Sequence, residues 1–381
     1  MLEQQQITII GGGLGGLTLA SILHRHGVDV AVHELEASPT IRRQGSILDM
    51  HEESGQLALQ RAGLLEAFRT HVIPGADVML ILDKTGAIHW QDSSNNTRPE
   101  IGRGVLRNLL RQSLPADSIH WNSKVNSIAR LEKGRYEVRL ANDETFTTTL
   151  LIGADGAWSK VRPLLSEARP VYSGISFVET HLFDIDVHHP EVAALVGRGS
   201  MAALSNEKGL LTQCDGEGHL TVYVALKTTD EHWLATSGID LEDTVSVRSH
   251  LLNIFAIWDK RLRALIAEHD TEFLLRGLYT LPVDHRWERV PGVTLLGDAA
   301  HLMLPSGEGA NLAMLDGAEL AEALLSHLHD VEAALAAYEE ALFPRSAAAA
   351  VDSIMLTNAM YTTDAPQGMV DLMTRYAGQV K

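Results

Sequence analysis

The stretch ITIIGGGLGG at residues 7–16 decides the fold class. Its first half, residues 7–10, is an apolar, largely β-branched run of the kind found in a buried parallel strand. After the glycines, residues 17–26 follow helical periodicity, and Gly27 stands where a helix C-cap is expected. Residues 28–33 then alternate as a second strand. This segment therefore predicts a βαβ unit.

The glycines fit the GxGxxG pattern of dinucleotide-binding proteins through Gly11, Gly13 and Gly16. The pattern is weak by itself, but here it follows a strand, opens a helix and is answered by Glu34 at the end of the next strand. Glycine lets the backbone approach a pyrophosphate at a helix N-terminus, and the carboxylate can accept a ribose hydroxyl. We interpret the segment as a dinucleotide site; a glycine-rich turn in an unrelated α/β fold is the alternative.

Composition narrows the class of protein. The chain has 381 residues, which is enough for two domains, and its 45% hydrophobic and 21% charged residues exclude disorder and collagen-like repetition. With 31 basic and 49 acidic residues, its formal net charge is −18. Such an acidic chain is repelled by nucleic-acid phosphates and by anionic membrane surfaces, so neither is an expected partner.

A single cysteine, Cys214, excludes an intramolecular disulfide, a CxxC redox pair and a thiolate zinc site. The first residues, MLEQQQ, contain no basic leader, and no apolar run is long enough to span a bilayer. We therefore expect a soluble cytoplasmic protein, acting as a monomer.

The rest of the chain alternates between two patterns. In chain order, the sequence predicts a helix over 54–68, a hairpin over 78–90, a helix over 104–114, strands over 119–152, short strands over 170–227, helices over 241–268, a strand over 293–296 and a helical tail to Lys381. The βα-type segments at the start, middle and end enclose a β-rich insert. This order predicts a discontinuous nucleotide-binding domain interrupted by a sheet-rich second domain.

Two further motifs each follow a predicted strand. Residues 153–162 read GADGAWSKVR, and residues 297–301 read GDAAH, with Pro305 and GEGAN at 307–311 downstream. Each could be only a turn. Their order along the chain, after GxGxxG, is much more specific than any one of them.

With these motifs, the chain resembles the class A FAD-dependent monooxygenases of the aromatic hydroxylase type, most closely the tetracycline-inactivating Tet(X) type. The resemblance covers essentially the full length. Further supporting stretches are Arg42, DMH at 49–51, SGQ at 54–56, AGLL at 62–65, the segment 101–110 and WD at 258–259.

The resemblance implies an α/β fold like that of p-hydroxybenzoate hydroxylase: a Rossmann-type FAD-binding domain, a β-sheet substrate domain and a C-terminal helix that bridges them. The implied domains are FAD-binding segments 1–72, 101–168 and 283–342, substrate-binding segments 73–100 and 169–282, and a bridging segment 343–381.

The resemblance also implies which residues bind cofactors. The ADP half of FAD would be held by Gly11, Gly13, Leu14, Gly15, Gly16 and Glu34. The rest of FAD and its surroundings would be contacted by Asp49, Arg103, Asp298, Gly307, Gly309, Ala310 and Asn311. Asp155 and Gly156 would lie by the pyrophosphate and the path of the reductant, and Arg42 is a candidate for the NADPH phosphate.

The implied substrate residues follow the pattern of the family less closely than the cofactor residues do. Glu179 and Ser200 align where tetracycline-inactivating relatives use glutamine and arginine, and Arg198 lies close enough in sequence to compensate. Pro305 and Met360 are further candidates. Leu35 and Glu308 also depart from the arginine and glutamine usual in the family, and the loop after His301 is one residue shorter.

The implied activity follows from the cofactor. NADPH would reduce the flavin, and O2 would give a C4a-hydroperoxide that transfers one oxygen atom to a polycyclic or aromatic small molecule, a tetracycline being one candidate. No side chain need act as nucleophile, and we identify no catalytic acid or base. The alternatives are a flavin reductase or dehydrogenase without oxygen transfer, and a drug-sequestering flavoprotein with little turnover.

Three other patterns have two interpretations each. Asp184, Asp186 and His188 share one face of a predicted strand, which we interpret as a polar edge without metal, a metal site being the alternative. His301 is interpreted as a structural hydrogen-bonding residue at a helix entry rather than a catalytic one. The helical stripe of the tail is interpreted as packing rather than a ligand box; it consists of Met355, Met360, Tyr361, Met369 and Met373.

Overall fold

The computed structural model describes residues 7–39, 47–92, 98–240 and 242–379. The chain divides into two compact units, each built from three segments. Unit 1 comprises Met1–Val72, Arg103–Val171 and Tyr279–Asp352, and unit 2 comprises Ile73–Gly102, Tyr172–Leu278 and Ser353–Lys381. The sequence prediction placed 343–381 in a separate segment, whereas here one helix, α12 (Val331–Met360), contributes residues to both units.

Unit 1 is built on a five-stranded sheet with the order β17-β11-β1-β2-β7, and every neighbouring pair is parallel. Its strands are β1 (Ile7–Ile10), β2 (Val30–His33), β7 (Ile119–His120), β11 (Leu150–Gly153) and β17 (Val293–Leu295). The apolar runs of β1 and β11 are entirely buried, as a sheet covered on both faces requires. The predicted βαβ start is confirmed.

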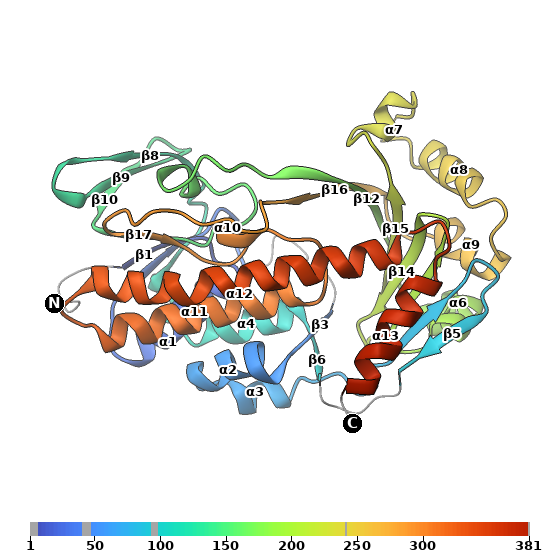
Figure 1. The fold of residues 1–381 in the computed structure, drawn as a ribbon, viewed down its shortest axis with the longest axis horizontal. Coiled ribbons are helices and arrows are strands. Elements are labelled where there is room, and N and C mark those ends of the chain that lie inside the picture. Colours follow the sequence, from blue (N-terminus) through green and yellow to red (C-terminus); the bar gives the residue numbers. More distant parts are fainter. Residues whose placement is uncertain (1–6, 40–46, 93–97, 241, 380–381) are drawn as a thin grey trace. The chain divides into compact units, whose positions relative to one another are not determined.

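The two faces of this sheet carry different layers (Figure 1). Helices lie on one face, and on the other lies an antiparallel sheet of β8 (Val125–Arg130), β9 (Tyr136–Leu140) and β10 (Thr145–Thr148). The helices of unit 1 are α1 (Leu14–Arg25), α2 (Leu57–Ala62), α3 (Leu65–Arg69), α4 (Arg103–Gln112), α10 (Asp298–His301), α11 (Glu308–Ser326) and the first part of α12. The short elements are β3 (Ile47–Asp49), η2 (Glu52–Gln56), η3 (Ala116–Ser118), η4 (Glu132–Gly134) and η5 (Arg162–Leu164).

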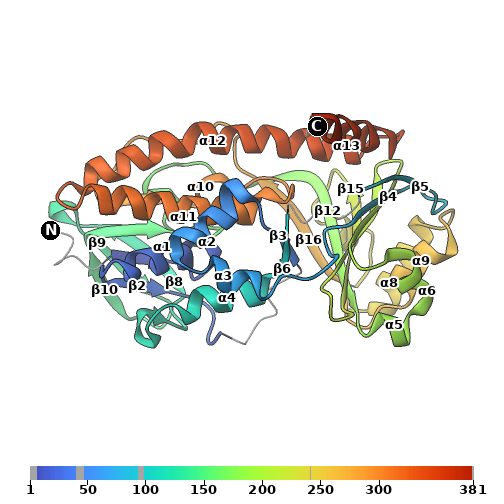
Figure 2. The ribbon, with the colours of Figure 1, turned by 90° about the horizontal axis from the view of Figure 1, so that it is seen from below.

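Helices α1 and α11 approach each other through small residues. A Cβ atom on Gly15 would meet the Ala313 carbonyl carbon at 3.1 Å, and one on Gly317 would meet the Leu19 amide at 3.0 Å. Backbone therefore packs on backbone, and the glycine loop before α1 comes to lie beside α11. Figures 1 and 2 both show the two helices side by side.

Unit 2 is built on a seven-stranded sheet with the order β16-β12-β15-β14-β13-β4-β5. Its strands are β4 (Met79–Leu82), β5 (Ile88–Gln91), β12 (Val171–Leu182), β13 (Ser200–Ser205), β14 (Lys208–Cys214), β15 (Leu220–Lys227) and β16 (Leu274–Thr280); β6 (Glu100–Gly102) lies outside this sheet. Its helices are α5 (Ile185–His188), α6 (Pro190–Val196), α7 (Trp233–Thr236), α8 (Thr244–Ile254), α9 (Lys260–Ala267), the end of α12 and α13 (Gln367–Gln379).

Each face of this sheet has its own apolar core. Val178, Leu182 and Cys214 belong to a core with helices α6, α8 and α9, whereas Phe177 belongs to a core on the other face. The tail covers that second face: Tyr361 and Met369 are buried in it, with Met360 and Met373 packed against them. The packing interpretation of the tail is confirmed for these four residues, but Met355 is 42% exposed.

Two sequence predictions of secondary structure are wrong in detail. Residues 54–68 are not one helix, because Gly63 adopts a left-handed conformation (φ +74°) that ends α2, and α3 starts afresh at Leu65. Residues 184–188 are not a strand, because Asp184 is left-handed (φ +47°) and is the N-cap of α5. Asp184, Asp186 and His188 therefore do not share a strand face.

Residues 170–227, predicted as short strands, also contain the helices α5 and α6, and Gly197 (φ +70°) ends α6 and leads into β13. Among the described residues, no group of three or more His, Cys, Asp or Glu side chains is placed to hold a metal ion. Within the same ranges, no helix is long and apolar enough to cross a membrane.

Candidate functional site

The glycine loop leaves the N-terminus of α1 open. Gly11 (φ +111°) and Gly16 have no room for a side chain, because a Cβ atom would overlap the Ala154 carbonyl or the Gly11 carbonyl, respectively. Gly13 is different: it is the N-cap of α1, and a Cβ atom there would meet no atom of the described residues within 4 Å. The position that a side chain would occupy is open, and glycine offers no side-chain oxygen to cap the first amides of the helix. This arrangement suits an anion.

Glu34 lies at the end of β2, directly beside this loop. One carboxylate oxygen accepts a hydrogen bond from the Gly12 amide at 2.7 Å, and the other accepts one from the Glu36 amide at 2.9 Å. Each carboxylate oxygen has two lone pairs, so Glu34 keeps the capacity to accept a hydroxyl donor from a ligand.

Arg107 completes this corner, and the sequence analysis missed it. From α4, its Nε donates to the Gly12 carbonyl at 2.9 Å, while Nη1 lies 2.7 Å from Glu36 and Nη2 lies 3.5 Å from Glu34. Leu35 is 60% exposed and contributes no charge. The guanidinium group beside Glu34 thus comes from α4 rather than from the residue after the acid. A sequence signal existed, because Arg107 precedes Leu110 by three residues and so borders the apolar side of the predicted helix.

We expect Arg107→Lys to lower the free energy of unfolding by about 1–3 kcal/mol, because an ammonium group cannot reproduce the two hydrogen bonds and the additional ion pair of the guanidinium group. Urea unfolding of the apoprotein at pH 7 measures this. The matched control is Arg111→Lys one turn later, where the side chain is on the surface and the change should stay within about 0.5 kcal/mol. Equal effects at both positions would contradict a special role for Arg107.

The second motif folds around Asp155. Its carboxylate accepts hydrogen bonds from the Ser159 hydroxyl at 2.5 Å and from the Lys160 amide at 2.6 Å, and Gly156 (φ +76°) allows the turn between them. Burial raises the pKa of Asp155, and these hydrogen bonds oppose the rise. The Asp155 carboxylate therefore stabilises the turn that its own segment forms.

Arg162 joins the second motif to the third. It is buried, and its guanidinium donates to the carbonyls of Ala157 (2.8 Å), Ala299 (2.8 Å) and Asp298 (3.1 Å). The sequence analysis quoted Arg162 as part of a motif but gave it no role, because its partners lie far along the chain. The Asp298 carboxylate itself is exposed at the first residue of α10.

His301 has the structural role predicted for it, with a partner in the next helix. Its Nε2 lies 2.5 Å from Asp316, which also accepts the Gly297 amide at 2.9 Å and pairs with Arg345 of α12 at 2.9 Å. Burial lowers the pKa of His301, but the Asp316 carboxylate outweighs burial and raises it. Burial would raise the pKa of Asp316, and His301 and Arg345 hold it below its usual range.

The start of α11 forms a second helix N-terminus with a glycine N-cap in unit 1. Gly307 (φ +87°) is its N-cap, and a Cβ atom on Gly309 would meet nothing within 4 Å. Asn311 is fully buried: its amide donates to the carbonyls of Asp49 (2.8 Å) and Gly307 (3.2 Å), and its Oδ1 accepts the His51 amide at 3.0 Å. Its side chain therefore holds the site together.

The remaining predicted cofactor residues fall into three groups. Leu14, Gly15 and Gly16 lie in the first turn of α1, where they are buried, and Ala310 lies in the first turn of α11. Arg103 is exposed at the first residue of α4. Arg42 lies outside the described residues.

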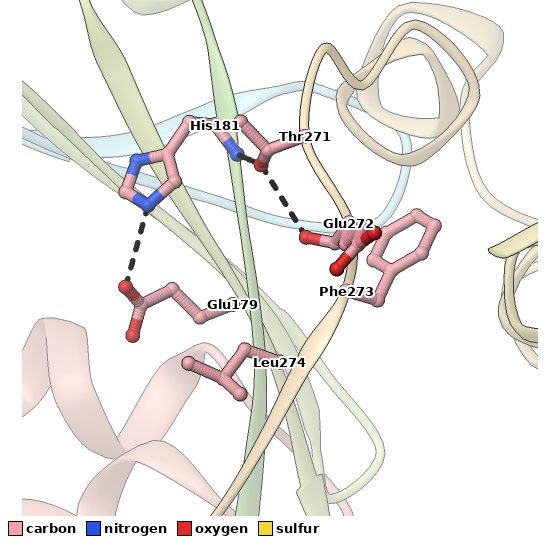
Figure 3. Close-up of a pocket in the computed structure, with 6 residues that line it drawn as sticks. All are labelled: Glu179, His181, Thr271, Glu272, Phe273 and Leu274. Atoms are coloured by element: carbon pink, nitrogen blue, oxygen red, sulfur yellow. Dashed lines mark hydrogen bonds and ion pairs between the residues drawn. The ribbon is translucent and has the colours of Figure 1, made fainter. Parts of the chain in front are cut away.

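The predicted substrate residues do not all come together. Glu179 on β12 pairs with Arg276 of β16 and lies 3.4 Å from His181, and Figure 3 shows the Glu179 and His181 side chains pointing toward each other. Ser200 is on β13, three strands away, opposite Gln213. Arg198 pairs instead with Asp186 at 2.9 Å on the surface. Met360 packs on the sheet of unit 2, and Pro305 is exposed in unit 1.

A pocket of about 410 Å³ opens beside Glu179 (Figure 3). Its lining consists of Glu179, His181, Thr271, Glu272, Phe273 and Leu274. Burial would raise the pKa of Glu179, but the hydrogen bonds from His181 and Arg276 outweigh it and lower the pKa. The pocket therefore presents an ionised carboxylate next to apolar surface.

The geometry of unit 1 fits a ligand that carries phosphates and sugar hydroxyls. Two helices begin at glycine N-caps, Gly13 and Gly307, and no atom of the described residues lies within 4 Å of a Cβ atom built on Gly13, Gly156 or Gly309. The exposed carboxylate of Asp298 adds a hydroxyl acceptor. Amides at helix N-termini bind anions, and carboxylates bind hydroxyls, so the residues present fit a flavin dinucleotide.

Comparison with known proteins agrees with this fit. Residues 4–353 match a family model described as "FAD binding domain". The chain belongs to this FAD-binding family. It is 32% identical to the monooxygenase asqM of Emericella nidulans over an alignment of 421 residues. This alignment spans 91% of this chain and 94% of the relative. The chain is therefore an FAD-dependent monooxygenase of the aromatic hydroxylase type.

Solved structures show the fold of this monooxygenase. HpxO of Klebsiella pneumoniae, complexed with FAD and uric acid, superposes with a TM-score of 0.80 at 20% identity, covering 98% of this chain and 93% of HpxO. The tetracycline destructase Tet(51) gives 0.74 at 18% identity, covering 98% and 96%. The predicted p-hydroxybenzoate-hydroxylase-like fold is confirmed. The likeness to tetracycline-inactivating enzymes is one of fold, because the 32% identical relative is a different monooxygenase.

Proposed function

We propose that this monooxygenase consumes NADPH and O2 to insert one oxygen atom into a polycyclic or aromatic small molecule. The observation that carries the proposal is the pair of helix N-termini with glycine N-caps in unit 1, at Gly13 and Gly307, in a chain of the FAD-binding family. When bound, FAD supplies electron transfer from the nicotinamide and activation of O2.

The protein's own residues would bind and orient the cofactor. In this proposal, the α1 terminus and Glu34 hold the ADP half, Asp298 accepts a ribityl hydroxyl, and the amides of 307–311 face the flavin. The turn at Asp155 and Gly156, fixed by Arg162, lies near the pyrophosphate and the path of NADPH. The net charge of −18 and a single buried cysteine support a cytoplasmic monomer.

For the substrate, we propose recognition on the sheet face of unit 2 around Glu179. An ionised carboxylate beside Phe273 and Leu274 suits an aromatic ring system that carries hydrogen-bond donors. A tetracycline has both features, and the fold shared with Tet(51) supports it as one candidate. Arg198 is less favourable for that substrate than its sequence position suggests, because it pairs with Asp186.

The test is a substrate screen with the FAD-reconstituted protein. Tetracyclines and other polycyclic aromatics are assayed for stimulated NADPH oxidation, and products are analysed by mass spectrometry. A product heavier by one oxygen atom supports the proposal. Anaerobic turnover without oxygen incorporation would identify a reductase instead, and binding without stimulated oxidation would identify a sequestering protein.

Glu179→Gln should raise the KM of an accepted substrate roughly tenfold, with kcat little changed, since a charge-assisted hydrogen bond is replaced by a neutral one. Steady-state NADPH oxidation measures both constants. The control is Glu242→Gln, an exposed glutamate of unit 2 away from the pocket lining, which should behave like the wild type. An unchanged KM in Glu179→Gln would place substrate recognition elsewhere.

A further inference from the structure

One histidine in unit 1 lies between two carboxylates from different elements. His51 is only 2% exposed; its Nε2 lies 2.7 Å from Asp49, the last residue of β3, and its Nδ1 lies 3.0 Å from Glu308, the first residue of α11. Both carboxylates are about one-third exposed, so each reaches solvent while the ring does not.

The geometry favours a charged imidazole. A neutral ring has one N–H donor, whereas both nitrogens of His51 lie close to acceptor-only groups. Nε2 is hydrogen-bonded to Asp49, and Nδ1 lies at ion-pair distance from Glu308 without forming a hydrogen bond, so the imidazolium form is the one attracted to both carboxylates. Burial lowers the pKa of His51, but Asp49 and Glu308 together outweigh it and raise the pKa to about 9. At neutral pH, the cluster therefore holds one positive and two negative charges.

The cluster is tied to the backbone that begins α11. The His51 amide donates to Asn311 Oδ1 at 3.0 Å, and the Asn311 amide group returns hydrogen bonds to Asp49 and Gly307. A Cβ atom on Gly55 would overlap Asn311 Oδ1, so the backbone of η2 packs closely against the Asn311 side chain. The ends of β3 and η2 and the first turn of α11 are therefore held as one assembly.

We propose that His51 is a positively charged positioning residue that fixes Asp49 and Glu308 at the start of α11, so that FAD binding at residues 307–311 requires its proton. The inference rests on the proposed FAD site. Without the proton, two carboxylates would repel each other at the positive end of a helix and oppose an anionic cofactor. With it, their charge is partly neutralised and the first turn is held in place.

The charged groups on the neighbouring elements favour the same protonation state. On η2, Glu52 and Glu53 are exposed and add negative charge. On α2, Arg61 pairs with Glu322 of α11 at 2.7 Å, so its charge is largely compensated. The surroundings on these elements therefore favour a cation at His51.

The test measures FAD affinity of the apoprotein by flavin fluorescence between pH 6.5 and 10. Bound FAD adds negative charge and strengthens the hold on the His51 proton, so wild-type affinity should fall as pH rises past about 9. His51→Gln should bind FAD about tenfold more weakly at pH 7, with no pH dependence from this group, one unit of pKa corresponding to a factor of ten. In Glu308→Gln, the fall in affinity should begin at a lower pH.

Unit 2 offers a matched control. His189 also lies between two carboxylates, Glu268 at 2.9 Å and Asp270 at 3.0 Å, and these outweigh burial and raise its pKa. His189→Gln removes an equivalent cation outside the proposed cofactor site. It should lower the melting temperature while leaving FAD affinity and its pH profile unchanged.

The outcomes separate this inference from the proposed site. Wild-type affinity and pH dependence in His51→Gln would overturn the role of His51 and leave the FAD site standing. If His51→Gln does not fold, Glu308→Gln decides, and an unshifted pH profile in that variant overturns the inference. Failure of the wild-type protein to bind FAD at any pH would overturn the proposed site itself.

Discussion

Replacing Asp316 by alanine should destabilise the protein by about 3–5 kcal/mol. Asp316 is fully buried in α11, and three groups meet its carboxylate: the Gly297 amide, the His301 ring and the Arg345 guanidinium. Without it, a buried amide and two cations lose their shared partner. Such uncompensated burial is among the costliest single changes in a folded protein.

The measurement is urea unfolding at pH 7, and its pH dependence gives a second check. The pKa of Asp316 is depressed in the fold, so its contribution is present above its unfolded pKa and is lost as pH falls through the folded value. The pKa of His301 is raised, so its contribution is lost as pH rises through its folded value. In Asp316→Ala, the free energy of unfolding should depend less on pH in both pH ranges than it does in the wild type.

The control is Asp352→Ala on the exposed side of α12, which should change the free energy of unfolding by no more than about 0.5 kcal/mol. If Asp316→Ala costs less than about 1 kcal/mol, then His301 and Arg345 find other partners or solvent, and the buried ion cluster is not what joins α10, α11 and α12.

Local patterns predicted the parts of the fold that local geometry decides. Apolar runs of period two and period 3.6 located β1, α1 and β2, and the glycine spacing identified the loop between β1 and α1. The same approach failed at residues 184–188, because a five-residue alternation fits one turn of helix as well as a strand. There, the Ile185 amide bonds the Gly218 carbonyl, a long-range contact that no local pattern contains.

The functional side chains that the sequence analysis missed share one property: their partners are distant in sequence. Arg107 pairs with Glu36, 71 positions away, and Arg162 donates to the Ala299 carbonyl, 137 positions away. His51 lay within a quoted motif, but its meaning depends on Glu308 at the start of another helix. Motifs predict which backbone meets the cofactor, whereas the charges that support that backbone become visible only in the fold.

Gly13→Ala should leave the fold intact and reduce FAD affinity by about 100-fold or more. Gly13 has φ −78°, which any residue can adopt, and an added Cβ atom meets no atom within 4 Å in the part of the chain that the structure describes. The expected stability cost is that of alanine at an N-cap, about 1 kcal/mol or less. The methyl group would instead occupy the space beside the α1 terminus that we assign to the pyrophosphate, where close backbone approach is needed.

Gly11→Ala is the informative contrast. Its φ of +111° and the overlap with the Ala154 carbonyl mean that this variant should lose stability whether or not FAD is present. Urea unfolding of the apoproteins and fluorescence titration with FAD therefore separate the two roles of glycine in one loop. If Gly13→Ala binds FAD as tightly as the wild type, the open space at the α1 terminus is not where the pyrophosphate binds. A loss of stability in Gly13→Ala as large as that in Gly11→Ala would mean that the whole loop serves packing alone.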